Sequence, residues 1–290
     1  MKRYSTFYFI INLSSIAVAL LCIKYGDLPD LLSTPSLPVI ILLFIAIHII
    51  RFIRMYFILL EDLIQPNRFV ELYLKTTFVS AVIPYKIGEL FKMYCFSIET
   101  ASFLKGVVAV LIERFFDAIV IVLFMIPHAI ETGTPSTLLT FLSVFIIAIL
   151  IIYCSFENTY RYLNNFLVRR GGGKKSLALL KSLEVAKKAY DSAKLIIRGR
   201  FILLVLLSIV AWSIESLMIS IMETPEIHIS ETTIFNYIND GFFGITNAFS
   251  NNYALICAII FIPILIIIYG KKYYKSLIRK ATNEKNRNHI

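Results

Sequence analysis

Charged side chains interrupt stretches of this sequence that are otherwise apolar. Glu113, Arg114 and Asp117 lie within an apolar run from about 104 to 128. Glu113 follows Leu104 by nine residues, which is about 13 Å along a helix. An ionised group at membrane depth costs roughly 2.5–3.5 kcal/mol or more. These residues therefore need charged partners, either in an ion-pair network that holds helices together or at a site that binds a charged substrate.

Two arginines are the first candidate partners for these carboxylates. Arg51 and Arg54 lie in the apolar run at about 38–60, and their spacing places them on one helix face. The planar guanidinium group suits phosphate because it donates two parallel hydrogen bonds. If the whole run spans a membrane, both arginines face an internal cavity. If the span ends near residue 50, both side chains extend to the cytoplasmic interface instead.

A further set of charges follows a break in the helical pattern. Pro84 and Gly88 interrupt an apolar stretch, which predicts a re-entrant helical hairpin over about 68–98 with its tip near these residues. The charged residues after the break recur every three positions: Lys86, Glu89 and Lys92. With the exposed amides at the start of the second limb they describe an anion site. The lysines are also candidate partners for the buried carboxylates. The alternative is an amphipathic loop that faces the cytosol.

Glu215 is a single acid in the middle of the apolar run at 200–222. It either stays neutral through desolvation and carries a proton, or forms hydrogen bonds to a broken backbone segment. The candidate substrate-binding residues are Arg51, Arg54, Lys86, Glu89, Lys92, Glu113, Arg114, Asp117 and Glu215.

The composition indicates an all-α polytopic membrane protein that forms one transmembrane domain. Hydrophobic residues make up 58% of the 290 residues and charged residues 17%, whereas soluble domains average about 45–50% and about 25%. Six apolar runs predict crossing helices at about 5–24, 38–60, 104–128, 137–154, 200–222 and 254–270. The start Met1-Lys2-Arg3 lacks a cleavage pattern after the first run, which we interpret as a retained helix.

The distribution of basic residues predicts the orientation. The amphipathic loop 155–199, together with Arg200, carries eleven basic and three acidic side chains, so we expect it and both termini to be cytoplasmic. The plasma membrane of a bacterium or archaeon fits this pattern. Glycines and asparagines at about 233–252 suggest a second, external re-entrant segment. Two broken segments that enter from opposite faces would indicate inverted repeats around a central site.

The sequence contains no motif for catalysis, a metal or a cofactor. The four cysteines are far apart and form no zinc pattern, and neither a metalloprotease nor a hydrolase motif occurs. We therefore expect no enzymatic activity, no metal and no cofactor. The net charge of +10 is explained by basic cytoplasmic loops, so we expect membrane lipids as partners and no nucleic acid.

Two motifs together resemble the lysylphosphatidylglycerol synthase transmembrane family, which is also described as flippase-like and overlaps an uncharacterised membrane group. PYKIGELFK at 84–92 matches the family pattern Pro-x-(Arg/Lys)-x-Gly-Glu-x-x-(Arg/Lys). ERFFD at 113–117 matches Glu-Arg-x-x-Asp, about twenty residues later as in the family. Trp212 and the following Ser213-Ile214-Glu215 resemble a later, tryptophan-containing span.

The resemblance implies a helical bundle with re-entrant helices that moves lipids between leaflets. Aminoacylated phosphatidylglycerol is the substrate of the named members, and other members resemble translocators of lipid-linked sugars or accompany glycosyltransferases. The family usually has a glycine-rich motif with a glutamate near the C-terminus, whereas residues 247–253 read NAFSNNY. The soluble aminoacyl-transfer domain is also missing, so we expect no synthesis of lysyl-lipid.

Three hypotheses follow for the function. The first is a lipid translocator that moves an anionic or lipid-linked head group in cell-envelope biogenesis. The second is a membrane scaffold that binds a glycosyltransferase or envelope-assembly enzyme through the basic loop. The third is an intramembrane transferase that uses Glu113 or Asp117 as a base, although no donor site is evident.

Overall fold

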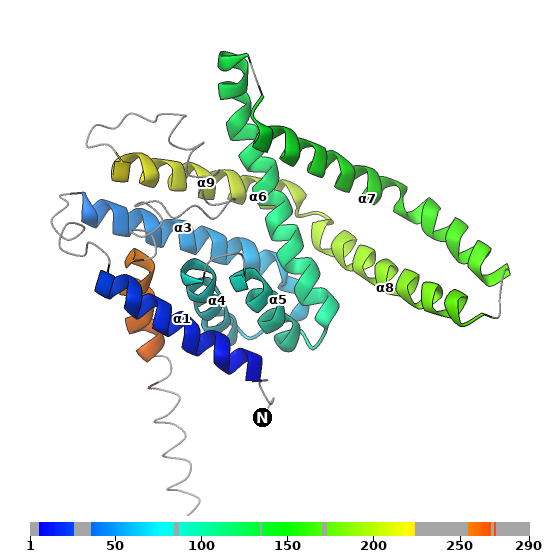
Figure 1. Ribbon diagram of the computed structural model, residues 1–290, viewed down its shortest axis with the longest axis horizontal. Helices are drawn as coiled ribbons and strands as arrows, with labels where there is room; N and C mark the ends of the chain where they lie inside the picture. The colour runs from blue at the N-terminus through cyan, green and yellow to red at the C-terminus, as the bar shows by residue number, and fades with distance from the viewer. Residues whose placement is uncertain are drawn as a thin grey trace, which may run out of the picture. The chain divides into compact units, whose positions relative to one another are not determined.

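The computed structural model describes residues 6–25, 36–83, 87–133, 135–169, 173–223, 255–267 and 270. Every regular element in these ranges is a helix (Figure 1). Three of them are long and apolar enough to cross a membrane: α3 (Leu37–Ile58), α7 (Thr137–Arg169) and α9 (Phe201–Glu223). The protein is therefore a helical membrane protein, as predicted, and the count of six crossings stays a prediction.

The chain divides into two compact units. The first comprises residues 1–34, 65–92 and 246–290. In it, α1 (Thr6–Tyr25) packs against α4 (Pro66–Val82), which begins with a proline at its first turn. A shorter apolar helix, Leu255–Ile267, covers most of the last predicted span. The predicted segment 233–252 lies outside the described residues.

The helical pattern breaks where the sequence predicts a hairpin. α4 ends at Val82 and α5 (Ile87–Glu99) begins after the break, while Pro84 and Lys86 lie outside the described residues. A methyl group on Gly88 would overlap the backbone of Ser80 in α4, so this close approach requires glycine. The structure thus has two helices over the predicted hairpin, and whether they re-enter a membrane stays a prediction.

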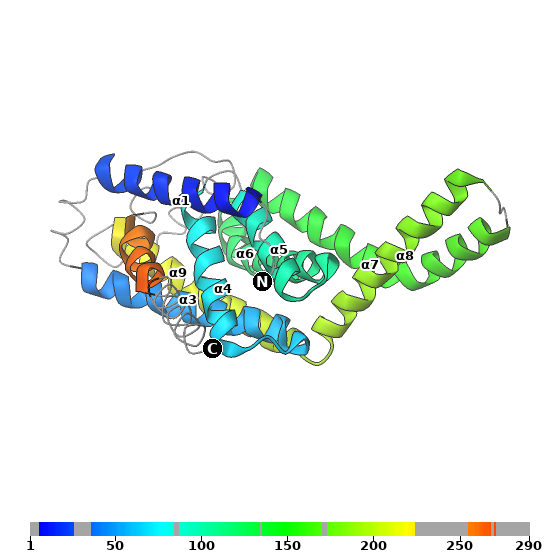
Figure 2. The same cartoon turned by 90° about the horizontal axis from the view of Figure 1, so that it is seen from below.

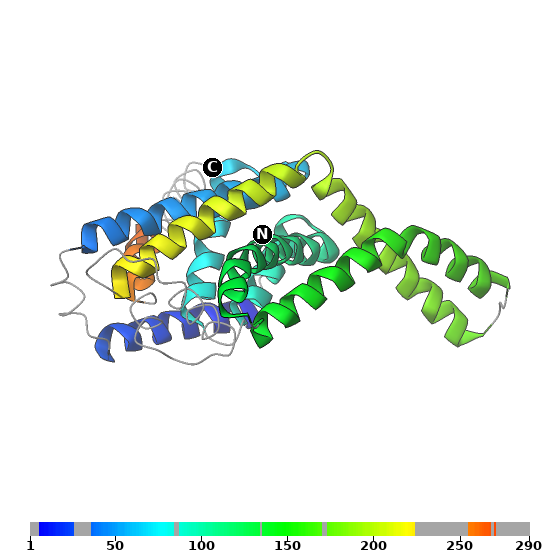
Figure 3. The same cartoon turned by 90° about the horizontal axis from the view of Figure 1, so that it is seen from above.

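The second unit comprises residues 35–64 and 93–245, and two antiparallel helices, α3 and α9, lie side by side in it (Figures 1 and 3). Charged residues fix the end of this pair. Arg200, just before α9, donates to the carbonyl of Phe57 at 3.1 Å and pairs with Glu61 in the short helix η1 (Leu60–Asp62). Lys105 in α6 (Phe103–Thr132) pairs with Asp62 at 2.5 Å. The start of α6 and that of α9 are therefore both tied to the end of α3.

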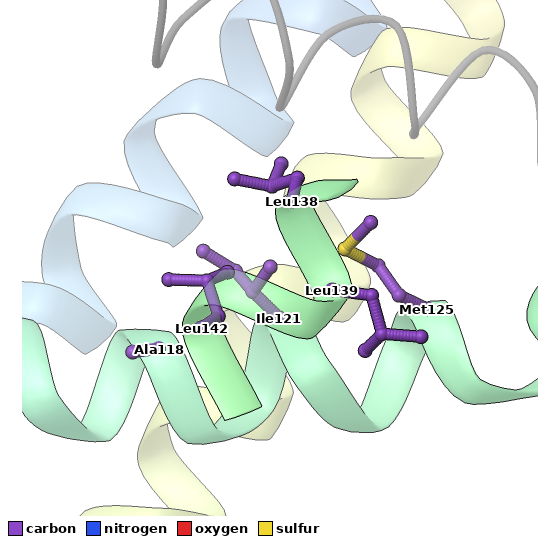
Figure 4. Close-up of a cluster of buried hydrophobic side chains, with 6 residues drawn as sticks. All are labelled: Ala118, Ile121, Met125, Leu138, Leu139 and Leu142. Carbon is purple, nitrogen blue, oxygen red and sulfur yellow. The ribbon is translucent and has the colours of Figure 1, made fainter. Parts of the chain in front are cut away.

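A hydrophobic cluster joins α6 to α7. Its members are Ala118, Ile121, Met125, Leu138, Leu139 and Leu142 (Figure 4). Ser136 caps the start of α7 by accepting a hydrogen bond from the amide of Leu139 at 3.1 Å. At the other end of α6, a methyl group on Gly106 would overlap the backbone of Ser97. α6 is therefore held by close contacts near both of its ends.

α7 extends beyond the predicted span. The sequence predicts that a loop begins after residue 154, but α7 continues to Arg169 and forms a hairpin with α8 (Lys174–Ile197) (Figure 1). No glycine or proline lies between residues 137 and 170, and the first helix-breaking sequence is the run at 171–173. The loss of apolar character at residue 155 therefore does not end the helix. α8 lies within the segment 155–199 that the sequence predicts to be amphipathic.

Candidate functional site

Arg54 is the centre of a charged cluster within the second unit. It lies in α3, its side chain is fully buried, and its guanidinium group forms four hydrogen bonds. Nη1 donates to Asp117 Oδ1 at 2.5 Å and to Ser208 Oγ at 2.7 Å. Nη2 donates to Glu113 Oε1 at 3.1 Å and to Asp117 Oδ2 at 3.3 Å. One side chain thus connects α3 to α6 and to α9.

The spacing of the two carboxylates explains why one arginine contacts both. Glu113 and Asp117 are four residues apart in α6, so they project from the same helix face. Both are buried. The sequence left several cations as candidate partners, and the structure places Arg54 on both acids. Charge-assisted hydrogen bonds satisfy these buried groups, which would otherwise be costly in an apolar surrounding.

A second ion pair lies one turn away along α3. Arg51 pairs with Glu215 of α9, so α3 and α9 are connected twice. The Arg51 guanidinium also lies 5.9 Å from the centre of the Trp212 ring, and the indole Nε1 of Trp212 donates to Asp117 Oδ1 at 3.2 Å. Neither role predicted for Glu215, proton carrier or partner of a broken backbone segment, describes this contact. Its position opposite Arg51 depends on the register of α3 against α9.

Arg114 completes the cluster from the outside. Its Nη1 lies 3.1 Å from Asp117 Oδ2 and its Nη2 lies 3.9 Å from Glu113 Oε2. The side chain is 43% exposed. Asp117 therefore receives hydrogen bonds from Arg54 and Trp212 and an ion pair from Arg114.

Accessibility differs within the cluster: Arg54 and the three carboxylates are buried, whereas Arg51 and Arg114 are partly exposed. The carboxylates of Glu113, Asp117 and Glu215 are at most 5% exposed, whereas the side chains of Arg51 and Arg114 are 19% and 43% exposed. The accessible charges of the cluster are therefore guanidinium groups, each paired with a buried carboxylate.

Sequence reasoning missed two residues of the cluster. Ser208 and Trp212 both donate or accept hydrogen bonds within it, yet neither belongs to the predicted substrate-binding set. The sequence does contain a pattern that links them, because positions 208, 212 and 215 follow the i, i+4, i+7 spacing of one helix face. A polar face on an apolar helix would have pointed to all three.

The remaining predicted residues lie outside the part of the second unit that the structure describes. Glu89 and Lys92 belong to the first unit, where Lys92 is buried in α5, and Lys86 lies outside the described residues. Within the described ranges, no group of three or more His, Cys, Asp or Glu side chains is placed to hold a metal ion. The geometry shows a network in which three guanidinium groups pair with three carboxylates.

Comparison with known proteins identifies the family. The search of curated proteins and that of solved structures found no match. The family model described as "Lysylphosphatidylglycerol synthase TM region" matches residues 8–222. This range contains the whole charged cluster from Arg51 to Glu215 and ends before residues 247–253. Since the match covers most of the chain, the protein belongs to the family of lysylphosphatidylglycerol synthase transmembrane regions.

Proposed function

We propose that the protein is a lipid translocator that moves an anionic or lipid-linked head group between the leaflets of the plasma membrane. The observation that carries this proposal is the charged cluster, in which the acids are buried and Arg51 and Arg114 remain accessible. Membership of a lipid-related membrane family supports it. The proposal assigns no covalent step to the site.

The phosphate of the head group is the part that these arginines recognise. A phosphate presents two oxygen atoms at the spacing of a carboxylate, so it can accept the same pair of guanidinium hydrogen bonds. In the structure the carboxylate of Glu215 forms an ion pair with the guanidinium group of Arg51. Exchange of this carboxylate for a phosphate keeps Arg51 paired, while the buried Glu215 loses its partner and takes up a proton, which it releases when it pairs with Arg51 again. When the head group leaves, Glu215 returns to Arg51 and restores the starting state.

Arg54 has a different role from the one that the sequence suggested. It is fully buried and its guanidinium group is occupied by Glu113, Asp117 and Ser208. We therefore assign Arg54, Glu113 and Asp117 to positioning, because they hold α3, α6 and α9 around the exchangeable pair. Lipid tails remain in the bilayer during transfer.

The predicted hairpin carries a separate set of charged residues. Lys86, Glu89 and Lys92 follow Pro84 in the sequence and match the family motif. We retain them in the proposal as a separate set of candidate head-group ligands. We also retain the predicted orientation, with both termini and the α7–α8 hairpin in the cytoplasm.

A reconstituted flipping assay tests the proposal. Purified protein enters liposomes that hold a fluorescent phospholipid or a fluorescent polyprenyl phosphate, and a membrane-impermeant quencher is added outside. We expect the wild-type protein to accelerate loss of inner-leaflet fluorescence and the double variant Arg51→Gln/Arg114→Gln to lose this activity. Arg198→Gln is the matched control because Arg198 is an exposed arginine outside the cluster.

Two results would count against the proposal in different ways. Flipping at the wild-type rate by the folded double variant would reject Arg51 and Arg114 as the head-group site. No acceleration of either lipid by the folded wild-type protein would reject translocation of phosphate-bearing lipids. Circular dichroism and gel filtration of each variant establish that it is folded.

A further inference from the structure

The hairpin of α7 and α8 extends further than a membrane-spanning helix needs. α7 has 33 residues, which corresponds to about 50 Å, whereas about 20 residues cross a hydrocarbon core. Its apolar residues are concentrated in the first half, up to about residue 154. The second half of α7 and the facing part of α8 therefore form an arm beyond the hydrocarbon core.

α7 changes direction about halfway along its length (Figures 2 and 3). Ser155 lies near the middle of α7, and its hydroxyl donates back to the carbonyl of Ile151 at 2.7 Å. A serine that bonds to the preceding turn in this way often bends a helix. The arm consequently leaves the spanning half at an angle, which allows it to follow a bilayer surface.

Stacked aromatic rings join the two helices of the arm near this bend. Tyr190 of α8 lies 4.6 Å from Phe156 and 5.2 Å from Tyr153 of α7, between ring centres. The ammonium group of Lys187 lies 5.2 Å from the centre of the Tyr190 ring. These contacts connect α8 to α7 within the arm.

The acidic residues of the arm are all paired. Glu184 pairs with Lys188 at 2.7 Å, and this hydrogen bond lowers the pKa of the Glu184 carboxyl group below its usual value. Asp191 pairs with Lys187 at 3.0 Å. Glu157 lies 3.9 Å from Lys194 and 4.0 Å from Lys187. These carboxylates therefore neutralise lysines in the inner part of the arm.

The far end of the arm, which we call the tip, keeps unpaired cations. Among the described residues, four exposed basic side chains of the tip have no carboxylate within ion-pair distance: Arg161, Arg169, Lys175 and Lys181. The hydroxyl of Ser176 donates to the carbonyl of Leu167 at 3.2 Å and so connects the two helices at the tip. The tip therefore presents a fixed positive surface.

Exposed apolar side chains also lie in the tip. Tyr162 and Phe166 stack with their ring centres 6.3 Å apart and are 70% and 40% exposed. Val168, Leu177 and Leu179 are also more than half exposed. Aromatic side chains interleaved with arginine and lysine suit the head-group region of a bilayer, where rings enter the interface and cations meet phosphates.

We propose that the tip of the α7–α8 hairpin docks on the anionic surface of the membrane that α7 spans. Tyr162 and Phe166 enter the interface, and the four unpaired cations bind lipid phosphates. The bilayer is the occupant because the arm grows out of a spanning helix and only about 21 Å of helix separates Ser155 from Arg169. The charge of the tip is complementary to anionic lipid.

Depth-dependent quenching of a tryptophan placed at the tip tests this proposal. The full-length variant Phe166→Trp is reconstituted in vesicles that contain brominated phosphatidylcholine, with or without phosphatidylglycerol. The signal of the native Trp212 is subtracted with the parent protein, since it is the only tryptophan of the chain. We expect the introduced tryptophan to be quenched in vesicles with phosphatidylglycerol and less so in neutral vesicles or at high salt.

A matched pair of lysines tests the role of the unpaired charges. Lys181 and Lys188 lie seven residues apart on one face of α8, and only Lys188 pairs with a carboxylate. In the Phe166→Trp background, Lys181→Gln should weaken docking about fivefold, the equivalent of about 1 kcal/mol for one lysine near an anionic surface. Lys188→Gln changes the net charge equally and should have a smaller effect.

Three outcomes would overturn the proposal. The first is a water-like, unquenched emission of the introduced tryptophan in vesicles with phosphatidylglycerol. The second is equal quenching in neutral and anionic vesicles that neither lysine substitution changes. The third is shielding of the tryptophan in detergent that increases with protein concentration, since a second copy of the chain would then cover the tip. Tyr162→Trp serves as the probe if Phe166→Trp is not folded.

Discussion

Replacement of Arg54 by methionine should strongly destabilise the protein. The side chain is fully buried and its guanidinium group forms hydrogen bonds to Glu113, Asp117 and Ser208. Methionine fills much of the same space but leaves both acids without their main partner. The loss of one member of a buried ion pair costs about 3–5 kcal/mol, because the remaining charge is left uncompensated. We expect the free energy of unfolding of Arg54→Met to be lower than that of the wild type by this amount.

Two further variants separate burial from charge. Arg114→Met removes an arginine from the same two carboxylates, but Arg114 is 43% exposed, so the expected loss is under about 1 kcal/mol. The triple variant Arg54→Met/Glu113→Gln/Asp117→Asn removes the stranded charges together with the arginine. Its free energy of unfolding should be at least about 2 kcal/mol higher than that of Arg54→Met.

Unfolding by sodium dodecyl sulfate in mixed micelles measures these differences. The fluorescence of Trp212 reports on the cluster, because its indole donates to Asp117. Circular dichroism measures the loss of helix in the whole protein. It therefore distinguishes global unfolding from a local change around the indole. A loss for Arg54→Met that is no greater than that for Arg114→Met would refute the conclusion that this network holds α3, α6 and α9 together.

Two more substitutions test the packing around the cluster. Gly106→Ala places a methyl group against the backbone of Ser97 and should cost about 1–3 kcal/mol. Gly173→Ala is its control, since no described atom lies within 4 Å of the added methyl group. It should lower the free energy of unfolding by less than about 1 kcal/mol. Equal losses of unfolding free energy in detergent would contradict this packing argument. Trp212→Phe removes the hydrogen bond to Asp117. It should lower the free energy of unfolding by about 1.5 kcal/mol or more, which circular dichroism during unfolding measures. An unchanged unfolding midpoint would show that the indole does not stabilise Asp117.

Much of the site could be predicted because it depends on local spacing. Glu113 and Asp117 share a face at i, i+4, and Arg51 and Arg54 share one at i, i+3, so each pair is visible in the sequence. A buried acid in an apolar run also requires a partner on physical grounds. Local spacing and the cost of burying charge therefore suffice to identify the residues of the cluster on α3 and α6.

The partner of Glu215 could not be predicted in the same way. It depends on how far α9 is shifted along α3, and this register is set by packing between residues more than 150 positions apart in the chain. No local pattern encodes it. The roles of Ser208 and Trp212 depend on the same register, although their shared helix face could have been noticed.

The end of α7 shows a different limit of sequence reasoning. The predicted end at residue 154 followed the apolar pattern, which reports where the membrane-like surface ends and not where the backbone hydrogen bonds end. Backbone continuity depends on helix-breaking residues, and the first of these are the glycines at 171–173. The arm beyond the hydrocarbon core therefore became visible only in the structure.

The most direct test of the central claim is whether a phosphate-bearing head group reaches Arg51 and Arg114. Trp212 lies beside Arg51, so its fluorescence can be titrated with a short-chain, monomeric phosphatidylglycerol, with the corresponding diacylglycerol as the phosphate-free control. We predict a saturable change for the wild-type protein only with the phospholipid. Since each charged hydrogen bond contributes about 1.5–3 kcal/mol, binding should weaken at least about tenfold in Arg51→Gln/Arg114→Gln. Equal responses of the wild type and the double variant, or equal responses to both lipids, would contradict the account.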